Sequence, residues 1–309
     1  MKFFKPKFWN NKNSIISLIF LPISIILQLL INVKKKFIKE VKFEIPIICV
    51  GNIYVGGTGK TPLSILIAKE LINRKKNPAI IKKLYSNHSD EHNLIKADLN
   101  CLFLNSKRSA AIHDAVNNGY DVAVLDDGFQ DFSIKKDLNI LCFNNNQLIG
   151  NGMTLPSGPL RENLNALKRS QIVIINGNKN LIFEKKILEI SNKIKIFYSN
   201  YVPLNIEQFK NKKIFAFAGI GNPENFFKLL KENGINVMKE VSFPDHYQFN
   251  DQEIKEIIDE SKKNNYEIVT TEKDFFRIKN CDLLNIKYIK NELKINDKNN
   301  FLNLILNHI

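Results

Sequence analysis

Short apolar runs alternate with amphipathic, helix-length segments along the chain from residue 45 onward. The first series predicts strand Ile45–Val50, helix Lys60–Asn73, strand Pro78–Ile81, helix Arg108–Asn117, and strands Asp121–Leu125, Asn139–Phe143 and Ile172–Ile175. A second series predicts strand Ile214–Gly219, helix Pro223–Asn233, strand Val237–Phe243, helix Asp251–Lys263 and strand Glu267–Thr271. This alternation of β and α segments favours an α/β fold with a doubly wound, mostly parallel sheet.

A polar stretch, Asn200–Lys213, separates the two series and marks the predicted domain boundary. We expect an N-terminal segment at residues 1–36, a larger α/β domain at residues 37–205 and a smaller α/β domain at residues 206–309. A polar loop at residues 150–161 interrupts the first series.

The N-terminal segment contains the most apolar stretch of the chain, SIISLIFLPISIILQLLI at residues 14–31. As a helix it would be about 27 Å long, slightly less than the ~30 Å hydrocarbon core of a membrane. Three lysines at residues 34–36 follow it without a small-residue cleavage site, so the pattern is not that of a secretory signal. Lysines also precede the stretch, so the charges lack the asymmetry that favours a simple span.

Polar residues within this stretch indicate how such a helix would lie. Ser14, Ser17, Ser24 and Gln28 share one helical face, and Pro22 is expected to kink or split the helix. We interpret the segment as an interfacial membrane anchor, with the aromatic residues at positions 3–9 at the level of the headgroups. A spanning helix and a buried core helix are the alternatives.

The formal net charge of +14 indicates which classes of binding partner to expect. The lysines are scattered among Asn and Ile and accompany no nucleic-acid-binding motif, so we expect no nucleic acid. A basic surface that faces an anionic membrane and a phosphorylated substrate fits better, and no obligate protein partner is evident. The cysteines, Cys49, Cys101, Cys142 and Cys281, form no CxxC pair, which indicates neither a disulfide framework nor a zinc site.

The first predicted strand leads into a glycine-rich turn, GNIYVGGTGKTP at residues 51–62, and then into a helix. This order is the setting of a phosphate-binding loop, in which backbone N–H groups and the helix N-terminus surround phosphate oxygens. Lys60 would neutralise the β- and γ-phosphates of ATP, and the Thr61 hydroxyl would bind Mg²⁺. Tyr54 stands where the strict motif has glycine, so a simple helix-capping turn is the alternative. The predicted ATP-binding residues are Val55, Gly56, Gly57, Thr58, Gly59, Lys60 and Thr61.

A pair of carboxylates, Asp126 and Asp127, ends the apolar strand VAVL and precedes a glycine. Carboxylates at this edge of a parallel sheet bind Mg²⁺ in phosphate-loop proteins. An Asp-Asp-Gly turn without a metal is the alternative. We predict that both aspartates bind Mg²⁺.

Five segments together resemble the ordered signature of the tetraacyldisaccharide 4'-kinases. They are VGGTGKTP at 55–62, LDDGFQ at 125–130, GNGMTLPSGPLRE at 150–162, FPDH at 243–246 and TEKD at 271–274. The third is the most specific of the five. The resemblance implies a bacterial enzyme at the cytoplasmic face of the inner membrane that uses ATP and Mg²⁺ to phosphorylate the 4'-hydroxyl of a tetraacylated glucosamine disaccharide 1-phosphate. It also implies a larger phosphate-loop domain, a smaller C-terminal domain and a site in the cleft between them.

The resemblance assigns further residues by position. Asp90 and His246 match a pair thought to remove the proton of the sugar hydroxyl, and a carboxylate beside an imidazole suits that task. Glu162 is implied as a further Mg²⁺ ligand. Phosphate or substrate contacts are implied for Arg108, Gln130 and Arg161.

The chain departs from the family at the acceptor side. Residues 82–86 read KKLYS where the family has SRGYG, and Asp131 stands where a histidine is usual. These differences predict an altered loop near the acceptor sugar. The rival interpretation is a membrane-bound phosphate-loop ATPase that switches a protein partner, which would need neither the GPLRE string nor His246.

Overall fold

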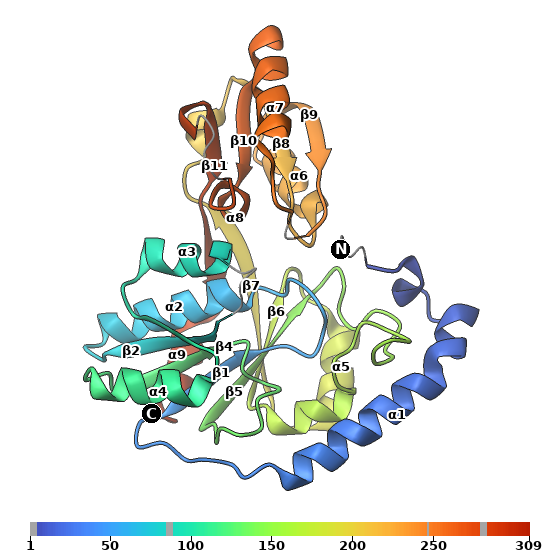
Figure 1. The fold of residues 1–309 in the computed structure, drawn as a ribbon, viewed down its shortest axis with the longest axis vertical. Coiled ribbons are helices and arrows are strands. Elements are labelled where there is room, and N and C mark those ends of the chain that lie inside the picture. Colours follow the sequence, from blue (N-terminus) through green and yellow to red (C-terminus); the bar gives the residue numbers. More distant parts are fainter. Residues whose placement is uncertain (1–4, 85–88, 246, 279–282) are drawn as a thin grey trace. The chain divides into compact units, whose positions relative to one another are not determined.

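The structure is a computed structural model that describes residues 5–84, 89–245, 247–278 and 283–309 (Figure 1). Its Cα packing forms two compact units. The larger comprises Lys5–Leu84, Leu99–Asn200 and Leu293–Ile309, and the smaller contains residues 89–98 and Tyr201–Glu292. The described residues thus confirm an α/β fold of two units.

An eight-stranded sheet forms the centre of the larger unit, in the order β12-β7-β6-β5-β1-β4-β2-β3. The register is parallel in the pairs from β7 through to β3. Its strands are β1 (Ile47–Gly51), β2 (Pro78–Lys83), β3 (Leu102–Asn105), β4 (Val122–Asp126), β5 (Leu138–Asn144), β6 (Ile172–Asn176), β7 (Lys195–Pro203) and β12 (Asn291–Ile295).

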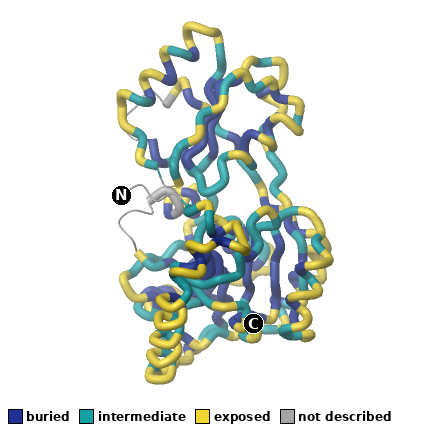
Figure 2. Tube along the Cα trace, turned by 90° about the vertical axis from the view of Figure 1, so that its right-hand side faces the viewer, coloured by how far each residue is buried: buried dark blue, intermediate teal, exposed yellow. Residues whose placement is uncertain are grey.

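The larger unit also contains helices, and the amphipathic ones between its strands bury one face. The helices of this unit are α1 (Ile15–Phe37), α2 (Lys60–Asn73), α4 (Arg108–Asn117), α5 (Leu181–Ile190) and α9 (Lys298–Leu306), with short 3-10 helices η1 (Lys7–Asn10) and η2 (Leu164–Arg169). The bounds predicted for α2 and α4 are confirmed. The strands β1 and β4, read from the sequence as continuous apolar runs, are buried throughout. Figure 2 shows buried segments of the chain inside and exposed segments at the outside.

The smaller unit has a four-stranded parallel sheet in the order β11-β10-β8-β9. Its strands are β8 (Lys213–Ala218), β9 (Asn236–Ser242), β10 (Glu267–Thr271) and β11 (Ile286–Ile289). The remaining elements are α3 (Ser89–Asp98), α6 (Pro223–Glu232), α7 (Asp251–Asn264), α8 (Glu272–Phe275), η3 (Ile206–Phe209) and η4 (Leu283–Asn285). Asp274 and Arg277 form a buried ion pair that also binds both backbone groups of Gly219, at the end of β8.

The units do not follow the two consecutive segments expected from the sequence. The helix α3 lies inside the predicted larger domain, yet it packs with the smaller unit, where Lys290 pairs with Asp98 at 3.0 Å. The chain beyond Leu293 returns to the larger unit, because β12 adds an edge strand beside β7. These contacts join residues that are distant in sequence, so local periodicity does not reveal them.

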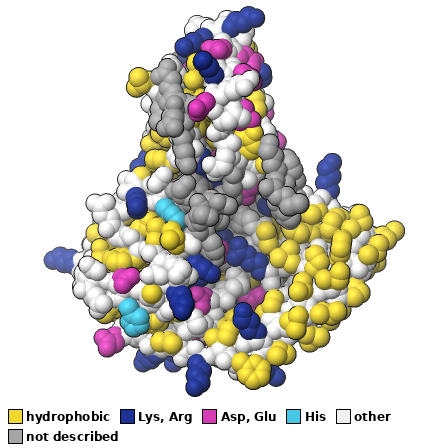
Figure 3. Space-filling view, viewed as in Figure 1, with side chains coloured by type: hydrophobic (Ala, Val, Ile, Leu, Met, Phe, Trp, Pro, Cys, Tyr) yellow, Lys and Arg dark blue, Asp and Glu magenta, His cyan; other side chains and the backbone are white. Residues whose placement is uncertain are grey.

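The helix α1 is continuous from Ile15 to Phe37, so Pro22 lies inside the helix and does not split it. Its polar side is the buried one: Ser17 and Ser24 have exposed fractions of 0% and 1%. The aliphatic side chains of the other faces are largely exposed and form a broad apolar surface (Figure 3). By length and composition alone, α1 is long and apolar enough to cross a membrane.

Candidate active site

The phosphate-binding loop connects β1 to α2. Gly59 caps α2 with φ 90°, a left-handed conformation that glycine adopts without strain. Asn52 is fully buried and braces the loop from inside, since its Nδ2 donates to Thr58 Oγ1 at 2.9 Å and to the Gly56 carbonyl at 3.2 Å. The loop therefore leads into a helix N-terminus, where N–H groups and the helix dipole favour an anion.

Tyr54, the departure from the strict motif, is 2% exposed. It forms a β-bridge with Leu160, and the next residue, Val55, donates its N–H to the Pro159 carbonyl at 2.9 Å. Arg161 in turn donates its N–H to the Ile53 carbonyl at 2.7 Å. Backbone contacts of residues 53–55 thus fasten the phosphate-binding loop to the GPLRE segment.

The fully buried carboxylate of Asp126 lies at the end of β4. Its Oδ2 accepts a hydrogen bond from Thr61 Oγ1 at 2.9 Å and is 2.5 Å from the Lys82 ammonium. Lys82, at 4% exposed, comes from the neighbouring strand β2. Thr61 and Asp126, both predicted to bind Mg²⁺, are therefore in contact with each other. Sequence reasoning did not identify Lys82 as a partner of Asp126, although a lysine directly after the apolar run of a strand is a usable signal.

Asp127 lies between Lys60 of the phosphate-binding loop and Arg161 of the GPLRE segment. Its Oδ1 is 3.8 Å from the Lys60 ammonium, and both carboxylate oxygens accept from Arg161 Nη1, at 2.9 and 3.2 Å. Burial would by itself raise the pKa of the Asp127 carboxyl, but the charges of Lys60 and Arg161 outweigh it and lower that pKa. The backbone carbonyl of Asp127 accepts from Arg108 Nη2 at 2.6 Å.

A polar network continues from Asp127 toward η2. Arg161 Nη1 lies 3.4 Å from Gln130 Oε1, and Gln130 Nε2 donates to Glu162 Oε1 at 3.2 Å. Both oxygens of Glu162 also accept from Arg169 Nη2, at 2.9 and 2.7 Å. Arg169 was not predicted, because nothing in the local sequence marks it as the partner of Glu162.

The same GNG…GPLRE loop that holds the phosphate-binding loop also holds α1. Ser24 Oγ donates to the Thr154 carbonyl at 3.0 Å and accepts the Ser157 N–H at 3.0 Å. Gln28 Nε2 donates to the Arg161 carbonyl at 3.2 Å. The loop therefore connects the apolar helix to the phosphate-binding loop.

The predicted acceptor residues are placed only in part. Asp90 is in the first turn of α3, within the smaller unit, but its side chain lies outside the description. His246 lies outside the described residues. Cys49 and Cys142 are buried, and burial raises the pKa of each thiol to about 12, which leaves both thiols protonated at neutral pH.

Comparisons with known proteins agree with this arrangement. The family model of tetraacyldisaccharide-1-P 4'-kinase matches residues 16–309. The tetraacyldisaccharide 4'-kinase of Pelagibacter ubique is 44% identical over 99% of this chain and 98% of its own, and that of Rickettsia bellii is 33% identical over 90% of each. The crystal structure of LpxK from Aquifex aeolicus in complex with ATP is 25% identical, covers 95% of this chain and 99% of its own, and has a TM-score of 0.72. This chain belongs to the tetraacyldisaccharide-1-P 4'-kinase family and is a kinase.

Proposed function

We propose that this protein transfers the γ-phosphate of ATP to the 4'-hydroxyl of a tetraacylated glucosamine disaccharide 1-phosphate, a step of lipid A synthesis, at the cytoplasmic face of a bacterial inner membrane. The observation that carries the proposal is the convergence of Lys60, Thr61, Asp126 and Asp127 at the C-terminal ends of β1 and β4. A partner-switching ATPase is not favoured, because the family match extends over the GPLRE segment and the smaller unit.

The donor half of the reaction rests on the larger unit. The amides of residues 55–61 and the Lys60 ammonium would surround the β- and γ-phosphates, and they would stabilise the charge that develops during in-line transfer. Arg161 donates to the Asp127 carboxylate and Arg108 donates to the Asp127 backbone carbonyl, so both guanidinium groups lie beside Asp127. We assign them to phosphate or substrate contacts, together with Gln130.

The oxygen donors at this edge suit Mg²⁺, which prefers hard oxygen ligands and is often bound by one or two carboxylates plus phosphates. Thr61 Oγ1 and Asp126 Oδ2 would hold it, with Asp127 beside them. Mg²⁺ would neutralise charge on the transferring phosphate. Glu162 remains a proposed ligand, one that would exchange its contact with Arg169 for the metal.

The acceptor half rests on Asp90 and His246. We propose that His246 removes the proton of the sugar hydroxyl and that Asp90 orients its imidazole. The substrate is anchored in the lipid phase, so α1, with its exposed aliphatic side chains, would hold the enzyme at an anionic membrane surface.

The proposal is tested with purified full-length protein, labelled ATP and a lipid A disaccharide 1-phosphate. We expect a lipid product that carries one additional phosphate at the 4'-position, identified by mass spectrometry after chemical cleavage. Lys60→Ala should abolish transfer, because the phosphates lose their main counter-charge, while the circular dichroism spectrum and Tm stay close to those of the unmodified protein. Wild-type transfer in that variant, or no transfer by the unmodified protein, would contradict the proposal.

A further inference from the structure

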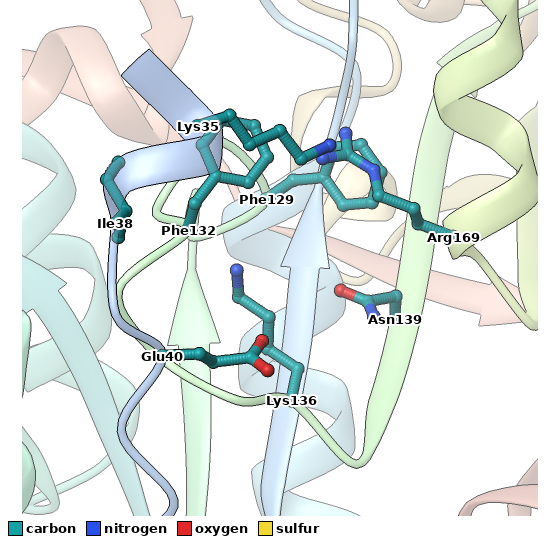
Figure 4. A pocket seen from close by; sticks show the side chains of 8 residues that line it. All are labelled: Lys35, Ile38, Glu40, Phe129, Phe132, Lys136, Asn139 and Arg169. Atoms are coloured by element: carbon teal, nitrogen blue, oxygen red, sulfur yellow. The ribbon is translucent and has the colours of Figure 1, made fainter. Parts of the chain in front are cut away.

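A pocket of about 340 Å³ lies beside the C-terminal end of α1, and its described lining contains no residue of the phosphate-binding loop (Figure 4). Three cationic side chains line it: Lys35 from α1, Lys136 from the loop before β5, and Arg169 from the end of η2. Phe129 and Phe132 form its apolar wall, and Glu40 is the only acidic residue among the lining side chains that the structure describes.

The three cations are held close together around one aromatic ring. The Lys35 ammonium is 4.4 Å, the Arg169 guanidinium 4.9 Å and the Lys136 ammonium 6.0 Å from the centre of the Phe132 ring. Figure 4 shows the ends of Lys35 and Arg169 near each other and the Lys136 ammonium directed into the same space. Contacts of this kind fix the positions of the cations without neutralising them.

The positive charge of the pocket is only partly compensated. Arg169 is paired with Glu162, but its buried Nε has no hydrogen-bond partner in the part of the chain that is described. Within that same part, neither Lys35 nor Lys136 forms an ion pair, although Lys136 donates to the Asp131 carbonyl. Burial lowers the pKa of both lysines, and the charge of Arg169 acts in the same direction, against the opposing charges of Glu162 on Lys35 and of Asp131 and Glu40 on Lys136. An anion in the pocket would relieve this repulsion.

We infer that this pocket binds the phosphate group of a membrane lipid. A phosphate offers several acceptor oxygens and a negative charge to three convergent donors, and the aromatic wall suits the attached sugar or glycerol. The place of the pocket supports a lipid, because Lys35 belongs to the last turn of the helix that exposes the apolar surface. Two lipids carry this chemistry: an anionic phospholipid, and the acceptor through its 1-phosphate, the latter resting on the proposed function.

The test measures binding of nucleotide-free, full-length protein to vesicles by co-sedimentation. Neutral phosphatidylcholine vesicles carry either phosphatidylglycerol, the acceptor, or the acceptor without its 1-phosphate, each at a low fraction that keeps the surface nearly neutral. Lys136→Gln is compared with Lys135→Gln, and Lys35→Gln with Lys34→Gln. Lys34 and Lys135 are exposed and lie outside the pocket lining, so each pair removes the same charge from adjacent positions.

We expect both pocket variants to lose affinity for a phosphate-bearing vesicle on the order of ten-fold relative to their controls, the size typical of one charge-assisted hydrogen bond. If the unmodified protein prefers vesicles with the acceptor to vesicles with the acceptor that lacks its 1-phosphate, and the pocket variants lose this preference, the acceptor is the ligand. If they instead lose a preference for vesicles with phosphatidylglycerol, the ligand is a phospholipid. If both pocket variants bind every vesicle as their controls do, the inference is wrong. No ATP is present, so this result stands apart from the transfer assay.

Discussion

The Oδ2 oxygen of Asp126 is shared between the Thr61 hydroxyl and the Lys82 ammonium. Both side chains of the Lys82–Asp126 pair are almost completely buried, at 5% and 0% exposed. Breaking a buried ion pair leaves an uncompensated charge, which costs about 3–5 kcal/mol. Lys82 therefore stabilises the site while it occupies an oxygen that we assign to Mg²⁺.

Lys82→Met keeps the apolar stem of the side chain and removes its charge. We expect the Mg²⁺ concentration for half-maximal transfer to fall several-fold, because the metal no longer competes with an ammonium for Asp126. The free energy of unfolding without nucleotide should fall by about 3–5 kcal/mol, measured by urea denaturation. Lys83→Met, at the next position and not paired with Asp126, is the control. An unchanged Mg²⁺ requirement in Lys82→Met would exclude competition between Lys82 and the metal.

The proposed joint action of Asp90 and His246 can be tested with single and double variants. His246→Ala should lower kcat on the order of 10²–10⁴-fold, the usual contribution of general acid–base catalysis, with little change in KM for ATP. Asp90→Ala should lose a similar factor, and the double variant should lose little more, because residues that act as one unit are not additive. Steady-state kinetics of the three variants measure this. Losses that multiply would show that the two residues act independently.

At the scale of elements, the loop at residues 150–161 connects α1 to the phosphate-binding loop, a role that its sequence pattern did not predict. It carries hydrogen bonds to α1 on one side and to the phosphate-binding loop on the other. The buried serine face of α1 is the face that docks here, so the aliphatic faces remain free for a membrane. The interfacial interpretation of α1 stays a prediction, but the expected place of Trp9 among the headgroups is wrong: its side chain is buried, and its Nε1 donates to the Pro156 carbonyl at 3.0 Å.

Replacing Ile19, Ile26 and Leu30 together with serine tests this interpretation. These side chains are 57–67% exposed and share one helical face. Burying each in lipid is worth about 1.5 kcal/mol or more, so vesicle binding should weaken on the order of 10³-fold while the Tm changes little. Ile182→Ser on α5, where the side chain is 86% exposed, is the matched control. The unmodified protein should come off membranes in carbonate, whereas resistance to both carbonate and high salt would favour a span.

At the scale of the whole molecule, the end of the chain completes the larger unit. The ring of Phe301 on α9 is fully buried and meets the ring of Phe197 on β7 edge to face, with centroids 5.5 Å apart. Lys298 on the same helix pairs with Glu70 on α2 at 2.6 Å. The C-terminal helix thus stabilises elements that precede it by about a hundred residues or more.

Phe301→Ala should therefore destabilise the larger unit by about 3–5 kcal/mol, because it removes a buried aromatic side chain and leaves a cavity. Hydrogen exchange in dilute urea should show faster exchange in β6 and β7, with little change in β8 and β10. Leu284→Ala, at a position 92% exposed in the smaller unit, should change stability by no more than about 0.5 kcal/mol. Equal losses of protection in both units would contradict the division of the chain described above.

The sequence by itself determined what depends on neighbouring residues. Continuous apolar runs specified the buried strands β1 and β4, and helical periodicity with polar ends specified α2 and α4. The glycine-rich turn between strand and helix specified the phosphate-binding loop, because its chemistry is contained within a dozen residues.

Only the tertiary structure decided which distant residues meet. It placed Lys82 against Asp126 and Arg169 against Glu162, and it assigned α3 to the smaller unit and α9 to the larger. The physical reason is that an ion pair or a packed ring depends on the separation of side chains in space. Strand order sets that separation, and the periodicity of any one segment is the same whichever neighbour it finds.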